Sequence, residues 1–97
     1  MGSYSLSGRA QFDLVGIYKY GKKRFGQEQV LDYLYALEGI LEELAERPEL
    51  ARDTSYIAHS LRYYSYMAHV VFYQFDGNNE IYVVRILGKR MNFIAHF

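Results

Sequence analysis

The sequence predicts an α+β domain in which an antiparallel pair of helices packs on one face of a small antiparallel sheet. Residues 8–46 carry apolar side chains at the three-and-four spacing of amphipathic helices. Residues 61–87 hold runs rich in β-branched and aromatic residues, which are typical of strands. A chain of 97 residues has room for one hydrophobic core, so residues 1–97 form a single domain.

The N-terminal segment predicts a short strand followed by the first helix. Apolar and polar residues alternate from Tyr4 to Ser7, which places Tyr4 and Leu6 on one face. The hydroxyl of Ser7 is a suitable N-cap for the helix that follows. The apolar stripe of that helix is Ala10, Leu14, Ile17 and Gly21. Gly26 ends the helix, because glycine adopts the left-handed conformation that many C-terminal caps need.

The second helix has the clearest periodicity in the chain. Its apolar stripe, spaced four, three, four and three residues apart, is Val30, Leu34, Leu37, Leu41 and Leu44. Pro48 closes the helix, since the residue before a proline avoids the helical conformation. The single glycine-containing turn between the helices predicts an antiparallel helical hairpin.

Three strands follow a polar connection that is expected to become extended near Tyr56. Their sequences are LRYYSYMA, HVVFYQF and EIYVVRIL, and the turn signal DGNN separates the last two. The middle strand is apolar on both faces, with Val71 and Tyr73 on one and Val70 and Phe72 on the other. One face should meet the helices, so the other must meet something else or stay partly exposed. A short C-terminal tail follows and is expected to be mobile.

The composition excludes several classes of protein. Eleven basic and eleven acidic residues give a formal net charge of zero, which argues against a general nucleic-acid binder. The chain has no cysteine, so it has neither disulfides nor thiolate metal sites. No apolar run approaches the roughly 20 residues of a membrane helix, and the N-terminus does not resemble a signal peptide. A cytoplasmic protein without membrane contact is the expectation.

Several segments, in this order, resemble the ParE toxins of the RelE/ParE toxin–antitoxin superfamily. The opening strand and first helix are similar in YSLSGRAQFDLVGIYKY, where Ala10, Asp13, Leu14 and Ile17 occupy family positions. The turn and second helix are similar in RFGQEQVLDYLYAL, and the end of that helix in LAERPELAR. The last strands and the tail are similar in HVVFYQ and IYVVRILGKRM, so the resemblance covers nearly the whole chain.

Two positions depart from the family pattern. Gly8 stands where ParE-like chains usually have proline, which suits the first helical position better than glycine. Gly88 stands where these chains often have histidine, so any role of that histidine is absent here.

The resemblance implies a bacterial toxin that is held inactive by a small antitoxin in a hetero-oligomeric complex. ParE toxins are known for poisoning DNA gyrase, whereas RelE relatives cut messenger RNA on the ribosome, and the shared fold does not decide between these targets. A diverged toxin with another target is the third alternative. No cofactor and no sequence-specific contact with nucleic acid are implied.

An RNA-cutting toxin would need a base, an acid and a cation at the scissile phosphate. The candidates are His59, His69, His96, Arg62, Arg85, Lys89 and Arg90. The histidines are scattered and His69 begins a strand, where a structural role is expected, so no catalytic set is predicted. His96 is the residue to test first if the chain is a nuclease. No spacing of histidines or carboxylates indicates a metal site, and no phosphate-binding loop is present.

Two basic segments are the candidates for contact with a target. The first, KYGKKRFG, ends the first helix and holds Lys19, Lys22, Lys23 and Arg24, of which the last three are the candidates. Favourable interaction of these cations with the helix dipole is the alternative explanation for this run. The second follows the last strand and consists of Lys89, Arg90 and Met91. If the two segments lie together, they form a patch for an acidic protein surface or for DNA bound to one.

Two further target candidates are Arg85 and His96. Arg85 lies inside a strand, where its charge needs either an ion pair with a helix acid or an exposed face that meets the target.

The antitoxin would insert a helix into a groove or add a strand to a sheet edge. The candidates for that contact are Tyr56, Arg62, Tyr63, Tyr64 and Tyr66, for which ordinary sheet packing is the alternative.

Overall fold

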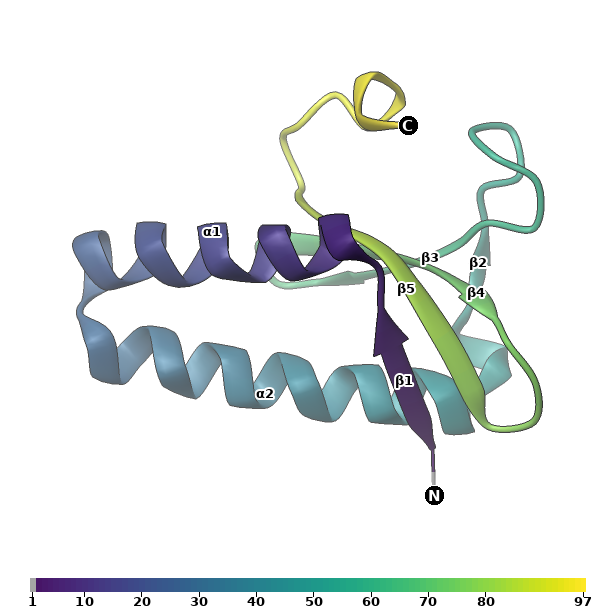
Figure 1. Cartoon of the computed structure of the whole chain (residues 1–97), viewed down its shortest axis with the longest axis horizontal. Helices are drawn as coiled ribbons and strands as arrows, with labels where there is room; N and C mark the ends of the chain where they lie inside the picture. Colours follow the sequence, from purple (N-terminus) through teal and green to yellow (C-terminus); the bar gives the residue numbers. More distant parts are fainter. Residues whose placement is uncertain (1) are drawn as a thin grey trace.

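The computed structural model describes residues 2–97 and confirms the α+β class and the predicted order of elements (Figure 1). The helices are α1 (Gly8–Phe25) and α2 (Gln27–Glu46), with short 3-10 helices η1 (Pro48–Leu50) and η2 (Ile94–His96). The strands are β1 (Ser3–Leu6), β2 (Arg52–Asp53), β3 (Arg62–Tyr66), β4 (His69–Phe75) and β5 (Glu80–Gly88). No helix among residues 2–97 is both long and apolar enough to cross a membrane.

The sheet is larger than expected, with five strands in the order β1-β5-β4-β3-β2. The three predicted antiparallel strands are β3, β4 and β5, and the β4–β5 hairpin lies at the centre as expected. β1 joins β5 in parallel, from the pair Ser3 and Glu80 to the pair Leu6 and Val83. The expected extension near Tyr56 is wrong, because the extended pair is β2 and Tyr56 lies in a turn.

The helical hairpin is as tight as one residue allows. Ser7 caps α1 as predicted, its hydroxyl accepting a hydrogen bond from the amide of Ala10 at 2.9 Å. Gly26 alone separates the helices; its φ of 92° is positive, but its ψ of 158° is extended rather than left-handed helical. A side chain at Gly21 would collide with Val30, so glycine there lets the two helices approach closely.

The main core lies between the hairpin and one face of the sheet, the helix face. Its buried residues come from both predicted helix stripes and from alternate positions of the central strands. They are Ala10, Leu37, Leu41, Leu44, Ala45, Val71, Tyr73, Ile81, Val83 and Ile86. Tyr4 and Leu6 pack against this cluster from β1, as the alternation in that strand predicted.

The opposite face of the sheet, the tail face, is covered by two irregular segments. Its buried residues are Leu61, Val70, Phe72 and Leu87. Ile57 and Ala58 pack on them from the loop before β3, and Phe93 from the C-terminal tail. The ring of Phe97 lies 5.1 Å from that of Phe72. The tail expected to be mobile therefore folds back over the sheet (Figure 1).

A β-bulge in β5 gives both faces apolar residues from one strand. Arg85 lies opposite Phe72 and Val83 opposite Tyr73, so Val84 is the extra residue. The bulge places Val83 and Ile86 in the helix-face core, and Val84 and Leu87 against the tail-face core.

Candidate partner-binding site

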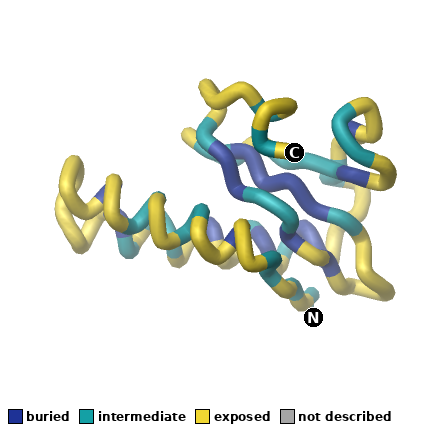
Figure 2. Tube along the Cα trace, turned by 45° about the horizontal axis from the view of Figure 1, so that its top comes forward, coloured by how far each residue is buried: buried dark blue, intermediate teal, exposed yellow. Residues whose placement is uncertain are grey.

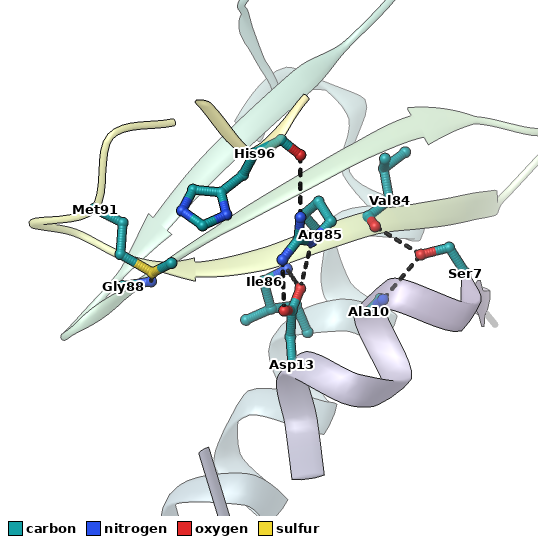
Figure 3. Close-up of polar contacts among 9 residues, drawn as sticks. All are labelled: Ser7, Ala10, Asp13, Val84, Arg85, Ile86, Gly88, Met91 and His96. Carbon is teal, nitrogen blue, oxygen red and sulfur yellow. Dashed lines mark hydrogen bonds and ion pairs between the residues drawn. The ribbon is translucent and has the colours of Figure 1, made fainter. Parts of the chain in front are cut away.

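A buried ion pair joins α1 to β5 where the first strand ends. Beyond Leu6, β1 no longer covers the edge of β5. There the carboxylate of Asp13 accepts a hydrogen bond from the backbone amide of Ile86 at 2.9 Å, in place of a neighbouring strand (Figure 3). The same carboxylate accepts two hydrogen bonds from the guanidinium of Arg85, from Nε and Nη2, both at 2.9 Å. Both side chains are nearly buried, with 12% and 13% exposed.

Arg85 also holds the C-terminal tail. Its Nη1 donates to the carbonyl oxygen of His96 at 3.0 Å, so one guanidinium links α1, β5 and the tail (Figure 3). The hydrogen bonds that Arg85 donates to Asp13 raise the pKa of Arg85. The ion pair with a helix acid, one of the two alternatives for Arg85, is therefore present. Sequence reasoning did not assign the partner, although Asp13 is the acid beside the apolar stripe of α1.

A groove of about 630 Å³ lies where the far half of the hairpin faces the ends of β4 and β5. Its lining is mostly apolar, which suits the side chains of a partner rather than a polar small molecule. The lining residues are Ile17, Tyr20, Gly21, Phe25, Gln29, Val30, Tyr33, Ala68, His69, Gly88, Lys89, Arg90 and Met91. We call it the hairpin groove.

A tyrosine–histidine pair supplies polar atoms in the lining of the hairpin groove. The hydroxyl of Tyr33 lies 2.7 Å from Nδ1 of His69, and the ring of Tyr66 lies 5.9 Å from that of Tyr33. Burial lowers the pKa of His69, which favours the neutral imidazole, and burial raises the pKa of Tyr33. The contacts of His69 agree with the structural role expected for it. The contact of Tyr33 with His69 was not predicted, because Tyr33 lies beside the apolar stripe of the second helix rather than within it.

Both predicted basic segments adjoin the hairpin groove. Lys89, Arg90 and Met91 are part of its lining. Lys22, Lys23 and Arg24 are exposed on the last turn of α1, between the lining residues Gly21 and Phe25. The sulfur of Met91 accepts the amide of Gly88 at 3.2 Å, which fixes the start of the tail (Figure 3).

The structure spreads the five antitoxin candidates over several surfaces. Tyr56 is 79% exposed on a loop, and Arg62 pairs with Asp53 at 3.0 Å. Tyr63 packs against the tail-face core, whereas Tyr64 and Tyr66 pack against the helix-face core. β2 pairs only with the first two residues of β3, so the edge of β3 from Tyr64 to Tyr66 has no neighbouring strand among residues 2–97.

The remaining histidines lie away from the groove lining. His59 belongs to the loop before β3, where its carbonyl accepts from Gln74, and His96 belongs to η2. Within the described residues, no group of three or more histidines and carboxylates is placed to hold a metal ion. The structure thus does not gather the three histidines into one constellation.

The family is decided by comparison with known proteins. Residues 4–93 match the model of a family described as the ParE toxin of the type II toxin–antitoxin system parDE. The chain belongs to the ParE toxin family. The predicted resemblance is thereby confirmed over nearly the whole toxin.

Named relatives and a solved structure agree with this assignment. "Toxin ParE1" of Caulobacter vibrioides is 36% identical over 99% of this chain and 98% of its own. "Toxin ParE1" of Mycobacterium tuberculosis is 34% identical, covering 92% and 91%. A chain of the "Chromosomal ParDE TA system from P. aeruginosa" has a TM-score of 0.74 at 19% identity, covering 91% of this chain and 96% of that one. That last likeness confirms the fold.

Proposed function

We propose that this ParE-family toxin inhibits DNA gyrase by direct contact in the cytoplasm and that a cognate antitoxin neutralises it by occupying the hairpin groove. The target is supported by the resemblance to ParE toxins, which are known for poisoning DNA gyrase. The observation that carries a binding function is the groove itself, which is largely apolar and has Lys89 and Arg90 in its lining. Such a lining suits the apolar side chains of a protein partner.

The antitoxin would contribute an amphipathic segment that folds as it binds. Its apolar side chains would contact Val30, Phe25 and Met91, and its carboxylates would lie near Lys89 and Arg90. The unpaired edge of β3 from Tyr64 to Tyr66 offers a second contact, because an extended segment there would add a strand to the sheet.

A matched pair of phenylalanines on α1 tests the antitoxin contact. Phe25 lines the hairpin groove and is 55% exposed, whereas Phe12 is 80% exposed and lies outside it. Truncating an interface aromatic typically costs about 1–2 kcal/mol, so Phe25→Ala should weaken antitoxin binding roughly 5- to 30-fold in calorimetry. Phe12→Ala should bind like the wild type. Equal affinities for all three proteins would remove the groove from the proposal.

The target is tested with purified gyrase, relaxed plasmid and stoichiometric toxin. We expect loss of supercoiling and accumulation of cleaved DNA, both reversed by the antitoxin. A toxin without effect at stoichiometric excess would contradict the gyrase proposal. Ribosome-dependent cleavage of messenger RNA, with His96→Ala as the first variant, is then the assay that separates a RelE-type nuclease from a toxin with another target.

A further inference from the structure

The net charge of zero conceals a strong separation of charge between the two helices. α1 carries five basic residues and one acidic residue, Asp13, which is already paired with Arg85. The basic residues are Arg9, Lys19, Lys22, Lys23 and Arg24. α2 carries six acidic residues and no basic one. They are Glu28, Asp32, Glu38, Glu42, Glu43 and Glu46.

Four of the five α1 cations lie in residues 18–25, which we call the hairpin tip. Lys19, Lys22, Lys23 and Arg24 are all exposed. None of the four forms an ion pair with a carboxylate among residues 2–97. The tip therefore carries four positive charges that no salt bridge within that range neutralises.

The acidic residues of α2 offset these charges only in part. At about 1.5 Å of rise per residue, Glu42 lies roughly 22 Å along the helix from Gln27, beyond the Debye length of about 8 Å at physiological salt. Glu28 and Asp32 are the only α2 acids in its first two turns. The charge that a ligand meets at the tip is thus positive, although the sum over the chain is zero.

The helix dipole does not account for the cluster. The C-terminus of α1 and the N-terminus of α2 are separated by Gly26 alone, so their partial charges, about −0.5 and +0.5, lie side by side and largely cancel. The attraction that usually explains cations at the end of a helix is weakened here. The dipole is therefore a weaker reason for four cations at this position than it is at the end of an isolated helix.

Aromatic rings hold two of these cations without neutralising them. Nζ of Lys22 lies 5.8 Å from the centre of the Tyr18 ring, and the guanidinium of Arg24 lies 5.9 Å from that of Tyr20. A cation–π contact orders a long side chain but leaves its charge available to an anion. A carboxylate partner would instead neutralise that charge. Tyr20 and Phe25 also expose 63% and 55% of their surface beside these charges.

The hairpin tip also projects from the rest of the molecule (Figure 1). The connection between α1 and α2 projects beyond the strands, away from both the sheet and the C-terminal tail (Figure 1). The same end is mostly exposed along its length (Figure 2). A projecting end of this kind can reach a double helix without a clash from the rest of the chain.

We propose that the hairpin tip binds the phosphate backbone of duplex DNA, through Lys19, Lys22, Lys23 and Arg24. Charges of one sign on exposed side chains, two of them held over aromatic rings, suit a regular array of phosphates and carry no base readout. All four cations remain available for such contacts, because no carboxylate among residues 2–97 forms a salt bridge with them. The contact goes beyond gyrase inhibition, because the toxin binds the nucleic acid itself and does so without sequence preference.

The test is the salt dependence of binding to a labelled duplex of arbitrary sequence. Each phosphate contact contributes about −0.9 to the slope of log K against log salt, so three to four contacts give a slope between about −2.7 and −3.6. Over a fourfold rise in salt, from about 50 to 200 mM, the affinity of the full-length toxin should fall roughly 40- to 150-fold. Fluorescence anisotropy at several salt concentrations measures both quantities.

Two double variants with equal change of net charge separate the tip from general electrostatics. Lys22→Glu/Lys23→Glu removes two tip cations, whereas Arg9→Glu/Arg52→Glu reverses two exposed cations elsewhere. The first should reduce the slope by about 1.8 and the second should leave it unchanged. Lys22→Gln/Lys23→Gln, which removes charge without adding repulsion at the helix end, should reduce the slope by the same amount. Circular dichroism checks that each variant is folded.

Three results would overturn the proposal. The first is a wild-type slope shallower than about −1, which corresponds to about one phosphate. The second is an equal loss of slope in the tip and control variants, which would indicate net charge alone. The third is an unchanged DNA slope in a tip variant that no longer binds gyrase in the absence of DNA, which would assign the tip to an acidic protein surface. Since the duplex assay contains no gyrase, its outcome is independent of the proposed inhibition.

Discussion

The two faces of the sheet are buried by different means. The helix face is covered by α1 and α2, whose stripes supply Leu37, Leu41 and Leu44 to a regular core. The tail face is covered by a loop and by the last residues of the chain, among them Phe93. A regular layer rests on many repeated contacts, whereas an irregular one depends on a few rings. The faces should therefore differ in how much stability one substitution removes.

The largest loss is expected on the helix face. Leu41 is 2% exposed within the core, and replacing a buried leucine by alanine costs about 2–5 kcal/mol, because the cavity is only partly refilled. Urea unfolding of Leu41→Ala should show a reduced midpoint with an unchanged slope. A loss below about 1 kcal/mol would mean that α2 relaxes into the space and that the helix face is no more ordered than the tail face.

A slightly smaller loss is expected where the two faces are joined. Asp13→Ala removes the partner of Arg85 and the acceptor of the Ile86 amide, leaving a nearly buried cation unpaired. Breaking such a pair costs about 3–5 kcal/mol when it is fully buried, so we expect about 2–4 kcal/mol here.

Replacing both partners distinguishes the cost of the unpaired charge from the cost of the lost hydrogen bond to the Ile86 amide. In Asp13→Ala/Arg85→Met, the unpaired charge is gone and part of the stability should return. A double variant as unstable as the sum of the single ones would indicate that the pair contributes nothing beyond its separate side chains.

How far the sequence predicts this molecule depends on how local each signal is. The stripes of α1 and α2, the cap at Ser7 and the central hairpin follow from patterns within a few residues. The parallel pairing of Ser3 with Glu80 and the ion pair of Asp13 with Arg85 join segments more than 70 residues apart, for which periodicity carries no information. The hairpin groove combines α1, α2 and the ends of two strands, so the sequence did not predict it, although Lys89, Arg90 and Met91 of its lining were candidates for target contact.

The tail face should be less sensitive to a single change than the helix face. Phe97 is 41% exposed and its ring meets Phe72 edge-on at 5.1 Å. Such aromatic pairs contribute about 0.5–1.5 kcal/mol, so Phe97→Ala should reduce stability by about 1 kcal/mol in the same urea experiment. A loss as large as that of Leu41→Ala would overturn the distinction between the two faces.

The smallest effect concerns a polar atom in the helix-face core. Tyr73 is fully buried and its hydroxyl has no hydrogen-bond partner among residues 2–97. Because an unsatisfied buried hydroxyl is costly, Tyr73→Phe should leave stability unchanged or raise it by up to about 1 kcal/mol at pH 7. A clear loss of stability would show that the hydroxyl is satisfied, for instance by water.

The same hydroxyl predicts a pH dependence. Burial raises the pKa of Tyr73 from 10.0 to about 12, so the unfolded chain loses this proton first. The folded state is then penalised as the pH rises above 10, and the loss levels off only above the folded value. Wild type should therefore lose more stability than Tyr73→Phe between about pH 10 and 12, with the other tyrosines contributing equally to both proteins. An equal loss of stability with pH in both proteins would mean that the helix-face core opens enough to hydrate this ring. The helix face would then be no more tightly packed than the tail face.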